Sequence, residues 1–173
     1  MRVSVGATAL AVNAHATALA ATERTLHIVA RVGAERFAFP VAGVEEALDA
    51  PAVAWVPVAP DGMTGQLLHR DRMIPAWDAG WAFRLATPAT GGAALVLRDG
   101  TRRVAFVVDD VLEMARIEAD DIRAVPGGAD LDGVLSGICF ATDGGNTLLN
   151  IVRVDALVAR LSSRGTIVDG EAK

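Results

Sequence analysis

The sequence predicts an all-β protein, built as small barrels or a sandwich with a few short helices. From residue 24 onward, apolar and polar residues mostly alternate, which is the period of a half-buried strand. Turns rich in Gly, Pro and Asp follow one another at close, regular spacing. The chain has 173 residues, 52% of them hydrophobic and 21% charged, so it can form one sizeable domain or two small barrels that share a core.

The first half of the chain predicts two pairs of strands separated by a short helix and an extended connection. Residues 26–32 and 37–41 alternate on either side of a glycine turn, which is the pattern of a hairpin. Residues 42–48 break the alternation and fit one face of a short helix. Prolines mark an extended connection from 51 to 62. Residues 65–78 then predict two short strands that meet at a charged tight turn.

The second half begins after a break at 88–92 and is built in a similar way, which suggests a duplicated barrel with a boundary near residues 80–92. Its clearest signal is an Asp-Gly turn between the apolar runs 94–97 and 104–108, which predicts a hairpin. The remaining elements are a strand or helical turn through 111–114, a loop at 126–128, a strand at 135–140, a turn at 143–146, a strand at 148–151, and a helix at 156–161 that Asp155 would cap and that ends near Gly165.

Segment 65–78, GQLLHRDRMIPAWD, has a glycine, an apolar strand, an arginine in a turn, and a second strand that ends in Pro-x-x-Asp. It resembles the signature of the CheW-like domain, the adaptor of bacterial chemotaxis systems. Further segments at 41–46, 104–111 and 151–157 resemble the same family in the same order. The similarity therefore spans about residues 26–160 and is more specific than any one motif.

The resemblance implies two intertwined five-stranded β-barrels of SH3-like type within residues 24–162, with strands exchanged between the two. We expect residues 1–23 to be a flexible alanine-rich tail and residues 163–173 to be a C-terminal tail. The sequence departs from the family pattern at Asp71 and Asp110, where glycine is common. Aspartate tolerates left-handed turn geometry better than most side chains, so we expect the turns to survive.

The resemblance also implies a function without catalysis, cofactor or metal. The groove between the barrels would hold the cytoplasmic tip of a chemoreceptor. The end of one barrel would bind the regulatory domain of a CheA-type histidine kinase. We expect a cytoplasmic protein, held at membrane-associated receptor arrays through these partners. A close variant is a CheW-like scaffold of a pilus or surface-motility system.

Five residues are the candidates for partner binding. Arg70 stands out, because a guanidinium in a tight turn can form bidentate bonds to a carboxylate or stack on an aromatic ring. Its alternative is an intramolecular ion pair with Asp71 or Asp78, worth about 0–1 kcal/mol if exposed. Val44 and Glu46 are either contact surface or ordinary amphipathic packing. The resemblance favours partner binding for the whole set.

Composition and motifs exclude several classes of function. The chain has 16 basic and 21 acidic residues and no basic stripe, which argues against a nucleic-acid partner. No window approaches the ~20 consecutive apolar residues of a membrane span, so we expect no direct membrane insertion. The sequence has no glycine-rich phosphate loop followed by lysine and no G-x-S-x-G motif. The acidic span 109–121 is interpreted as a solvated face.

Two alternatives from other classes remain open. Cys139 and His69 could form the nucleophilic dyad of a small hydrolase, although a single cysteine between apolar neighbours is more often buried. A small secreted ligand-binding β-barrel would require the first ~20 residues to be a cleaved signal peptide. The lone cysteine excludes an internal disulfide and suits a reducing compartment, which favours the cytoplasmic interpretation.

Overall fold

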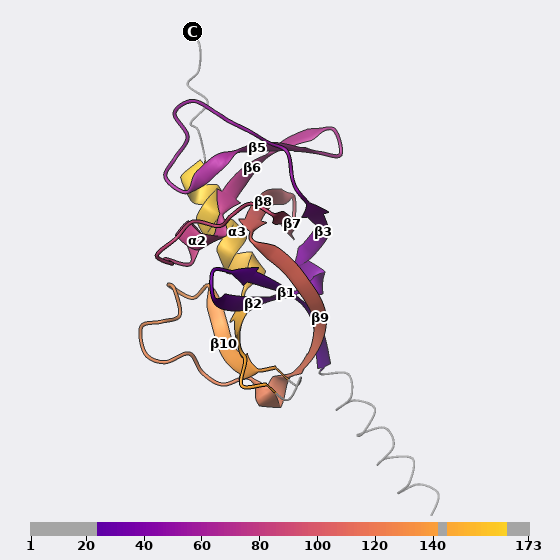
Figure 1. Ribbon diagram of the computed structural model, residues 1–173, viewed down its shortest axis with the longest axis vertical. Coiled ribbons are helices and arrows are strands. Elements are labelled where there is room, and N and C mark those ends of the chain that lie inside the picture. Colours follow the sequence, from indigo (N-terminus) through magenta and orange to yellow (C-terminus); the bar gives the residue numbers. More distant parts are fainter. Residues whose placement is uncertain (1–23, 142–144, 166–173) are drawn as a thin grey trace, which may run out of the picture.

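The structure, a computed structural model, describes residues 24–141 and 145–165, which form two β-sheets and a few short helices (Figure 1). The expected all-β class is confirmed. The tail predicted at 1–23 lies outside the described residues, and so does the tail predicted at 163–173 except for residues 163–165, which are helical. The strands are β1 (Arg24–Val32), β2 (Glu35–Pro40), β3 (Val44–Asp49), β4 (Val53–Ala54), β5 (Met63–His69), β6 (Arg72–Asp78), β7 (Ala93–Asp99), β8 (Arg102–Val108), β9 (Asp110–Glu118), β10 (Leu135–Phe140) and β11 (Leu148–Val152).

The chain leaves one sheet, builds the other, and returns to the first. The five-stranded sheet has the order β10-β11-β2-β1-β9, and the six-stranded sheet has the order β3-β7-β8-β6-β5-β4. Each sheet is antiparallel except for one parallel pair, β2 with β11 and β6 with β8. Residues 80–92 connect β6 and β7 of the same sheet, so the chain passes between sheets after β2 and after β8. In Figure 1 the six-stranded sheet lies above the five-stranded one.

The helix expected at 42–48 is mostly a strand. Only η1 (Val41–Gly43) is helical, as a single 3₁₀ turn, and β3 follows at once and pairs with β7. The register of that pairing shifts between Val44 and Glu46, which is a β-bulge or a similar irregularity. Such a bulge changes the phase of the alternation. A strand with a phase change looks like a helical pattern when it is only six residues long, and the prediction was wrong for this reason.

The other predicted elements need smaller corrections. The ambiguous segment 111–114 lies in β9, a nine-residue strand. The C-terminal helix α3 (Val154–Gly165) begins before Asp155, which therefore lies inside its first turn instead of capping it. The Asp155 carboxylate pairs with the Arg153 guanidinium at 2.9 Å. Of the turn expected at 143–146, residues 143 and 144 lie outside the described residues.

The hydrophobic core has three parts, and the largest lies between the two sheets. It joins β1 and β2 of one sheet to β6, β7 and β8 of the other, together with α2 (Ala79–Ala82) and α3. Three aromatic rings meet there: Phe83 stacks on Phe37 with 3.8 Å between centroids and meets the Phe106 ring edge-on. The other two clusters are smaller, and one of them fills the interior of each sheet. The sheets are therefore packed against each other as one unit.

Asp109, at the crossing from β8 to β9, is not part of a solvated face as predicted. Its side chain is 4% exposed. The carboxylate accepts hydrogen bonds from the backbone N–H of Gly33 (2.7 Å) and Thr90 (2.6 Å), and it pairs with Arg31 at 3.3 Å. Burial by itself would raise the pKa of Asp109, but these hydrogen bonds and the Arg31 charge hold it below its usual value.

Candidate functional site

The candidate site is built around the turn that joins β5 to β6. His69 pairs with Arg72 across the hairpin, so the turn itself has two residues. Both have left-handed backbones, with φ of 46° at Arg70 and 63° at Asp71, as in a type I′ turn. Aspartate is one of the few non-glycine residues that visit this region routinely. The hairpin therefore forms with aspartate in the position where the family usually has glycine.

Arg70 leans from this turn toward β3. Its Nη1 donates a hydrogen bond to Glu45 Oε1 at 3.1 Å, and its Nη2 lies 4.0 Å from Glu46 Oε2. Arg70 therefore pairs with these two glutamates, and not with Asp71 or Asp78, which were expected as its internal partners. The Arg70 side chain remains 66% exposed. The guanidinium is thus held in one direction while most of it stays open to a partner.

Glu45 is the anchor for this arrangement, and its side chain is only 12% exposed. Its carboxylate also accepts a hydrogen bond from Arg103 Nε on β8 at 2.7 Å and lies 3.8 Å from Arg98 Nε on β7. The hydrogen bond from Arg103 lowers the pKa of Glu45, and the positive charges of Arg103 and Arg70 lower it further. Glu45 is therefore ionised at neutral pH and binds three arginines from three elements.

A second contact links β3 to the same hairpin. His69 is 5% exposed and its Nε2 lies 2.7 Å from Glu46 Oε2. β3 is one edge of the six-stranded sheet and β5 lies next to the other edge. The contact therefore shows that this sheet curls until its two sides approach each other. We call the six side chains that meet there the turn cluster: Glu45, Glu46, His69, Arg70, Arg98 and Arg103.

The remaining predicted site residues have different environments. Asp71 is exposed beside Arg70, and no ion pair of its carboxylate is found among the described residues. Val44 is half-buried and packs against the core between the sheets. Asp78 is buried, and its Oδ1 accepts hydrogen bonds from the N–H groups of Gly80 and Ala89, both at 2.8 Å. We therefore leave Asp78 out of the docking surface proposed below, since its carboxylate is used within the fold.

Glu45, Arg98 and Arg103 are the members that the sequence reasoning missed. Glu45 was expected to point away from the apolar face of the short helix predicted at 42–48. Arg98 and Arg103 are directly paired across the β7–β8 hairpin, so their proximity to each other could be predicted from that hairpin's register. Their approach to Glu45 could not, because it depends on the pairing of β3 with β7, which the sequence does not signal.

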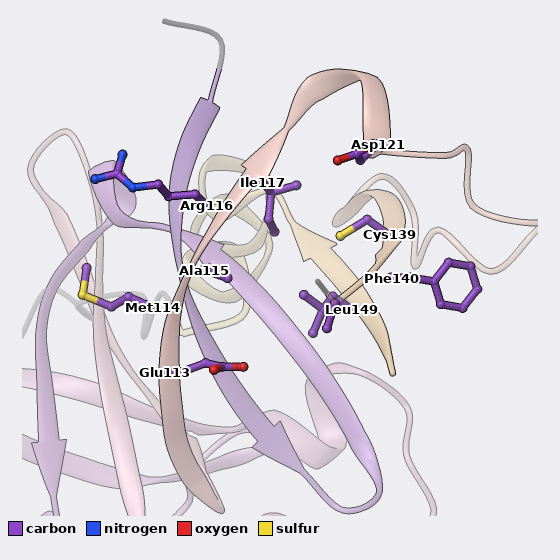
Figure 2. A pocket seen from close by; sticks show the side chains of 10 residues that line it. Glu113, Met114, Ala115, Arg116, Ile117, Asp121, Cys139, Phe140 and Leu149 are labelled. Carbon is purple, nitrogen blue, oxygen red and sulfur yellow. The ribbon is translucent and has the colours of Figure 1, made fainter. Parts of the chain in front are cut away.

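A separate groove opens in the five-stranded sheet, between its two edge strands β9 and β10 (Figure 2), and apolar side chains line it together with the charged Glu113, Arg116 and Asp121. The cavity has a volume of about 200 Å³. Ile117, Cys139 and Leu149 lie between the strands, and the Phe140 ring points outward. Met114 and Phe140 are each 58% exposed. Because these two exposed apolar side chains flank the groove, it is a second candidate for protein contact.

The structure does not bring Cys139 and His69 together as a dyad. Cys139 is 2% exposed in the core of the five-stranded sheet, where burial raises the pKa of its thiol. His69 lies in the other sheet and contacts Glu46. Within residues 24–141 and 145–165, no group of three His, Cys, Asp or Glu side chains is placed to hold a metal ion. No helix of this part of the chain is both long and apolar enough to cross a membrane.

The double-sheet fold has an exposed arginine held in a turn and an open groove flanked by exposed Met114 and Phe140, which are features of a protein-interaction domain. Comparison with protein families matches the CheW-like domain over residues 27–162. The chain therefore belongs to the CheW-like domain family, whose members are scaffolding adaptors of chemotaxis signalling. The search of curated proteins finds no match.

Among solved structures, the chain is similar to the scaffolding protein TtCheW from Thermoanaerobacter tengcongensis. The two share 18% sequence identity with a TM-score of 0.67, over 78% of this chain and 92% of that one. This similarity shows the fold, two SH3-like β-barrels, which confirms the expected architecture. The five-stranded and six-stranded sheets correspond to the two barrels in this description.

Proposed function

We propose that this protein links the cytoplasmic domain of a chemoreceptor to the regulatory domain of a CheA-type histidine kinase. The family supports the adaptor role. The observation that carries the specific proposal is Arg70, which is 66% exposed although Glu45 holds its guanidinium in place. The adaptor acts in the cytoplasm, at receptor arrays on the membrane, and it needs no cofactor for this role.

The turn cluster is the surface proposed for the receptor. An arginine that is already ordered loses less side-chain entropy on binding than a freely rotating one. Its planar fork can still form bidentate bonds to a receptor carboxylate or stack on a ring. Asp71 and Glu46 flank it and add negative charge that selects partners with a matching basic group. Val44 lies at the start of β3, next to Glu45, and packs against the core between the sheets.

The groove between β9 and β10 is the surface proposed for the kinase. In this family the kinase partner is a related barrel, so the contact pairs the end of one barrel with the end of another. Exposed Met114 and Phe140 supply the apolar area that such a contact buries. We expect the affinity of a single contact of this kind to be modest. The overall affinity rises when many adaptors, receptors and kinases assemble together.

The test is a binding measurement with purified receptor cytoplasmic fragment and kinase regulatory domain, comparing wild type with Arg70→Ala. We expect wild type to bind both, and Arg70→Ala to bind the receptor at least about tenfold more weakly, because interface arginines often act as hot spots. The melting temperature should stay within about 2 °C, since an exposed ion pair contributes only ~0–1 kcal/mol.

The matched control is Arg102→Ala. Arg102 is 50% exposed and pairs with Asp99 at 2.7 Å in the β7–β8 turn of the same sheet, so it resembles Arg70 without belonging to the turn cluster. Receptor affinity should be unchanged in this control. If wild type binds neither partner, the adaptor proposal fails. If Arg70→Ala binds like wild type, the assignment of the turn cluster fails while the family membership stands.

A further inference from the structure

A third feature lies apart from the turn cluster and the groove, where α2, α3 and the loop around residue 132 meet. Three arginine side chains converge there on a cavity of about 160 Å³, beside the ring of Trp81. Among the described residues that line the cavity, Asp132 alone is acidic, and the net charge of the chain is −5. We call this feature the arginine pocket, and its lining residues are Trp81, Ala82, Arg84, Asp132, Arg160 and Arg164.

Arg160 gives the arginine pocket a fixed frame. From α3 its guanidinium donates hydrogen bonds to the backbone carbonyls of Leu131, at 3.1 Å, and Ala82. These bonds tie the end of α2 and the loop at 131–132 to the helix. Burial lowers the pKa of Arg160, and the neighbouring charges of Arg84 and Arg164 add to this effect. The fold therefore holds the positive charges of these three arginines close together.

The other two arginines are presented to solvent. Arg164 lies over the Trp81 ring, with its guanidinium carbon 5.3 Å from the ring centroid. Arg84 is 62% exposed and pairs with Asp132 at 2.7 Å, while the Asp132 side chain is 74% exposed. Both residues of this ion pair have left-handed backbones, with φ of 56° and 60°. At Arg84 this geometry ends helix α2, where the Arg84 N–H donates a hydrogen bond to the Trp81 carbonyl, and at Asp132 it is one that aspartate adopts readily.

We propose that the arginine pocket binds the carboxylates of an acidic segment in a protein partner, and that Asp132 occupies Arg84 when the partner is absent. The Arg84–Asp132 contact shows that the pocket accommodates a carboxylate. Exposed ion pairs of this kind are weak, so Asp132 yields to a partner at little cost. Guanidinium groups match the planar shape of carboxylates, and the Trp81 ring offers an apolar side to the segment's aliphatic carbons.

This site is independent of the proposed function, because it shares no residue with the turn cluster or with the β9–β10 groove. It adds a surface that selects partners by negative charge. If the arginine pocket does not bind an acidic segment, the receptor and kinase assignments still stand. If those assignments are wrong, the proposal for the arginine pocket still stands.

The test is an NMR titration of the full chain with acetyl-tetraglutamate-amide at constant ionic strength. We expect chemical-shift changes at the Trp81 indole N–H and at the arginine Nε–H groups of the pocket. Arg84→Gln and Arg164→Gln should each weaken binding at least about fivefold, because each removes a charged bidentate donor. Asp132→Asn should strengthen binding at least about threefold, because it removes the competing carboxylate.

The control for the last variant is Asp99→Asn, which changes the net charge equally and releases Arg102 from an ion pair of the same 2.7 Å length. Binding should not change. An equal gain in peptide affinity in Asp99→Asn would show that the change in net charge alone causes the effect, and it would overturn the proposed site. So would a phosphate titration in which the same residues shift with no preference for the peptide, since that identifies a general anion site.

The chain's own residues Asp169 and Glu171 follow α3 in the sequence and are the remaining competitor. The double substitution Asp169→Asn with Glu171→Gln should leave the peptide affinity within about twofold. A larger gain in affinity would assign the arginine pocket to the chain's own carboxylates and overturn a partner segment as its occupant.

Discussion

Two buried aspartates hold neighbouring amides of one connection. Asp78 accepts from the N–H of Ala89 at 2.8 Å, and Asp109 accepts from the N–H of Thr90 at 2.6 Å. Asp78 ends β6, and Asp109 follows β8 at the crossing to the other sheet. Two successive residues of the connection from α2 to β7, Ala89 and Thr90, are therefore held by hydrogen bonds to carboxylates and not by strand pairing.

This arrangement predicts that Asp109→Ala lowers the free energy of unfolding by about 2 kcal/mol at pH 7, because two backbone donors lose a charged acceptor. The folded-state pKa of Asp109 lies below its usual 3.8. Its contribution is therefore complete above that value and is lost as the pH falls through the folded-state pKa. Denaturant unfolding from pH 7 to pH 3 should show the difference between variant and wild type shrinking only below about pH 4.

The neighbouring Asp110 provides the matched control, since it is exposed. Asp110→Ala should change stability by less than about 0.5 kcal/mol at either pH. Equal losses in the two variants would contradict the role assigned to the buried carboxylate. A loss in Asp109→Ala that persists unchanged at pH 3 would contradict its ionisation as the cause.

The β5–β6 hairpin forms although neither of its two turn residues is glycine. Arg70 and Asp71 both have positive φ, and left-handed geometry costs less for aspartate than for most residues but more than for glycine. We predict that Asp71→Gly raises the free energy of unfolding by about 0.5–1 kcal/mol, measured by denaturant unfolding at pH 7. Asp71→Asn should be close to neutral, because asparagine tolerates the same geometry. A gain in Asp71→Asn equal to that in Asp71→Gly would show that charge, and not backbone geometry, limits this turn.

Hairpins could be predicted from this sequence, while irregular pairing could not. β1 and β2 carry mostly alternating residues on either side of a glycine turn, and β7 and β8 are apolar runs on either side of an Asp-Gly turn, so both pairings follow from local pattern and turn chemistry. β3 was mistaken for a helix because the register shift near Val44 disturbs its alternation. The burial of Asp109 was missed for a related reason: its partners Gly33 and Thr90 are distant in sequence, and nothing local indicates that they converge.

Of the candidate site, the sequence predicted the turn that presents Arg70 but not the residues that position its side chain. The pattern of residues 65–78 placed an arginine in a tight turn between two strands, which the structure has. The partner Glu45 could not be predicted, because it reaches Arg70 only when the six-stranded sheet curls and brings β3 toward the hairpin. Curling of a sheet is a property of all its strands together and leaves no mark at one position.

The two proposed docking surfaces lie on different sheets. Arg70 belongs to the six-stranded sheet, and Phe140 ends β10 of the five-stranded one. We therefore predict that Phe140→Ser weakens kinase binding at least about tenfold and leaves receptor binding within twofold of wild type. Arg70→Ala should do the opposite, with the effects in the double variant adding to within about 0.5 kcal/mol. Calorimetric titration of each variant with each partner measures this.

Stability should stay near wild type in Phe140→Ser, because the ring is largely in solvent and outside the three core clusters. If Phe140→Ser abolishes both interactions in a folded protein, the two partners share one surface and the division proposed above is wrong. A variant that binds the kinase like wild type would remove the groove from the kinase contact.

The core between the sheets sets the mechanical character of the molecule. Phe83 touches rings from both sheets, and Asp109 bonds to segments of both. Because this interface is closely packed, we expect the two barrels to move together as one rigid body instead of bending at the segments that connect them. In the proposed position between a chemoreceptor and a histidine kinase, a stiff joint of this kind would pass a change of angle at one docking surface on to the other.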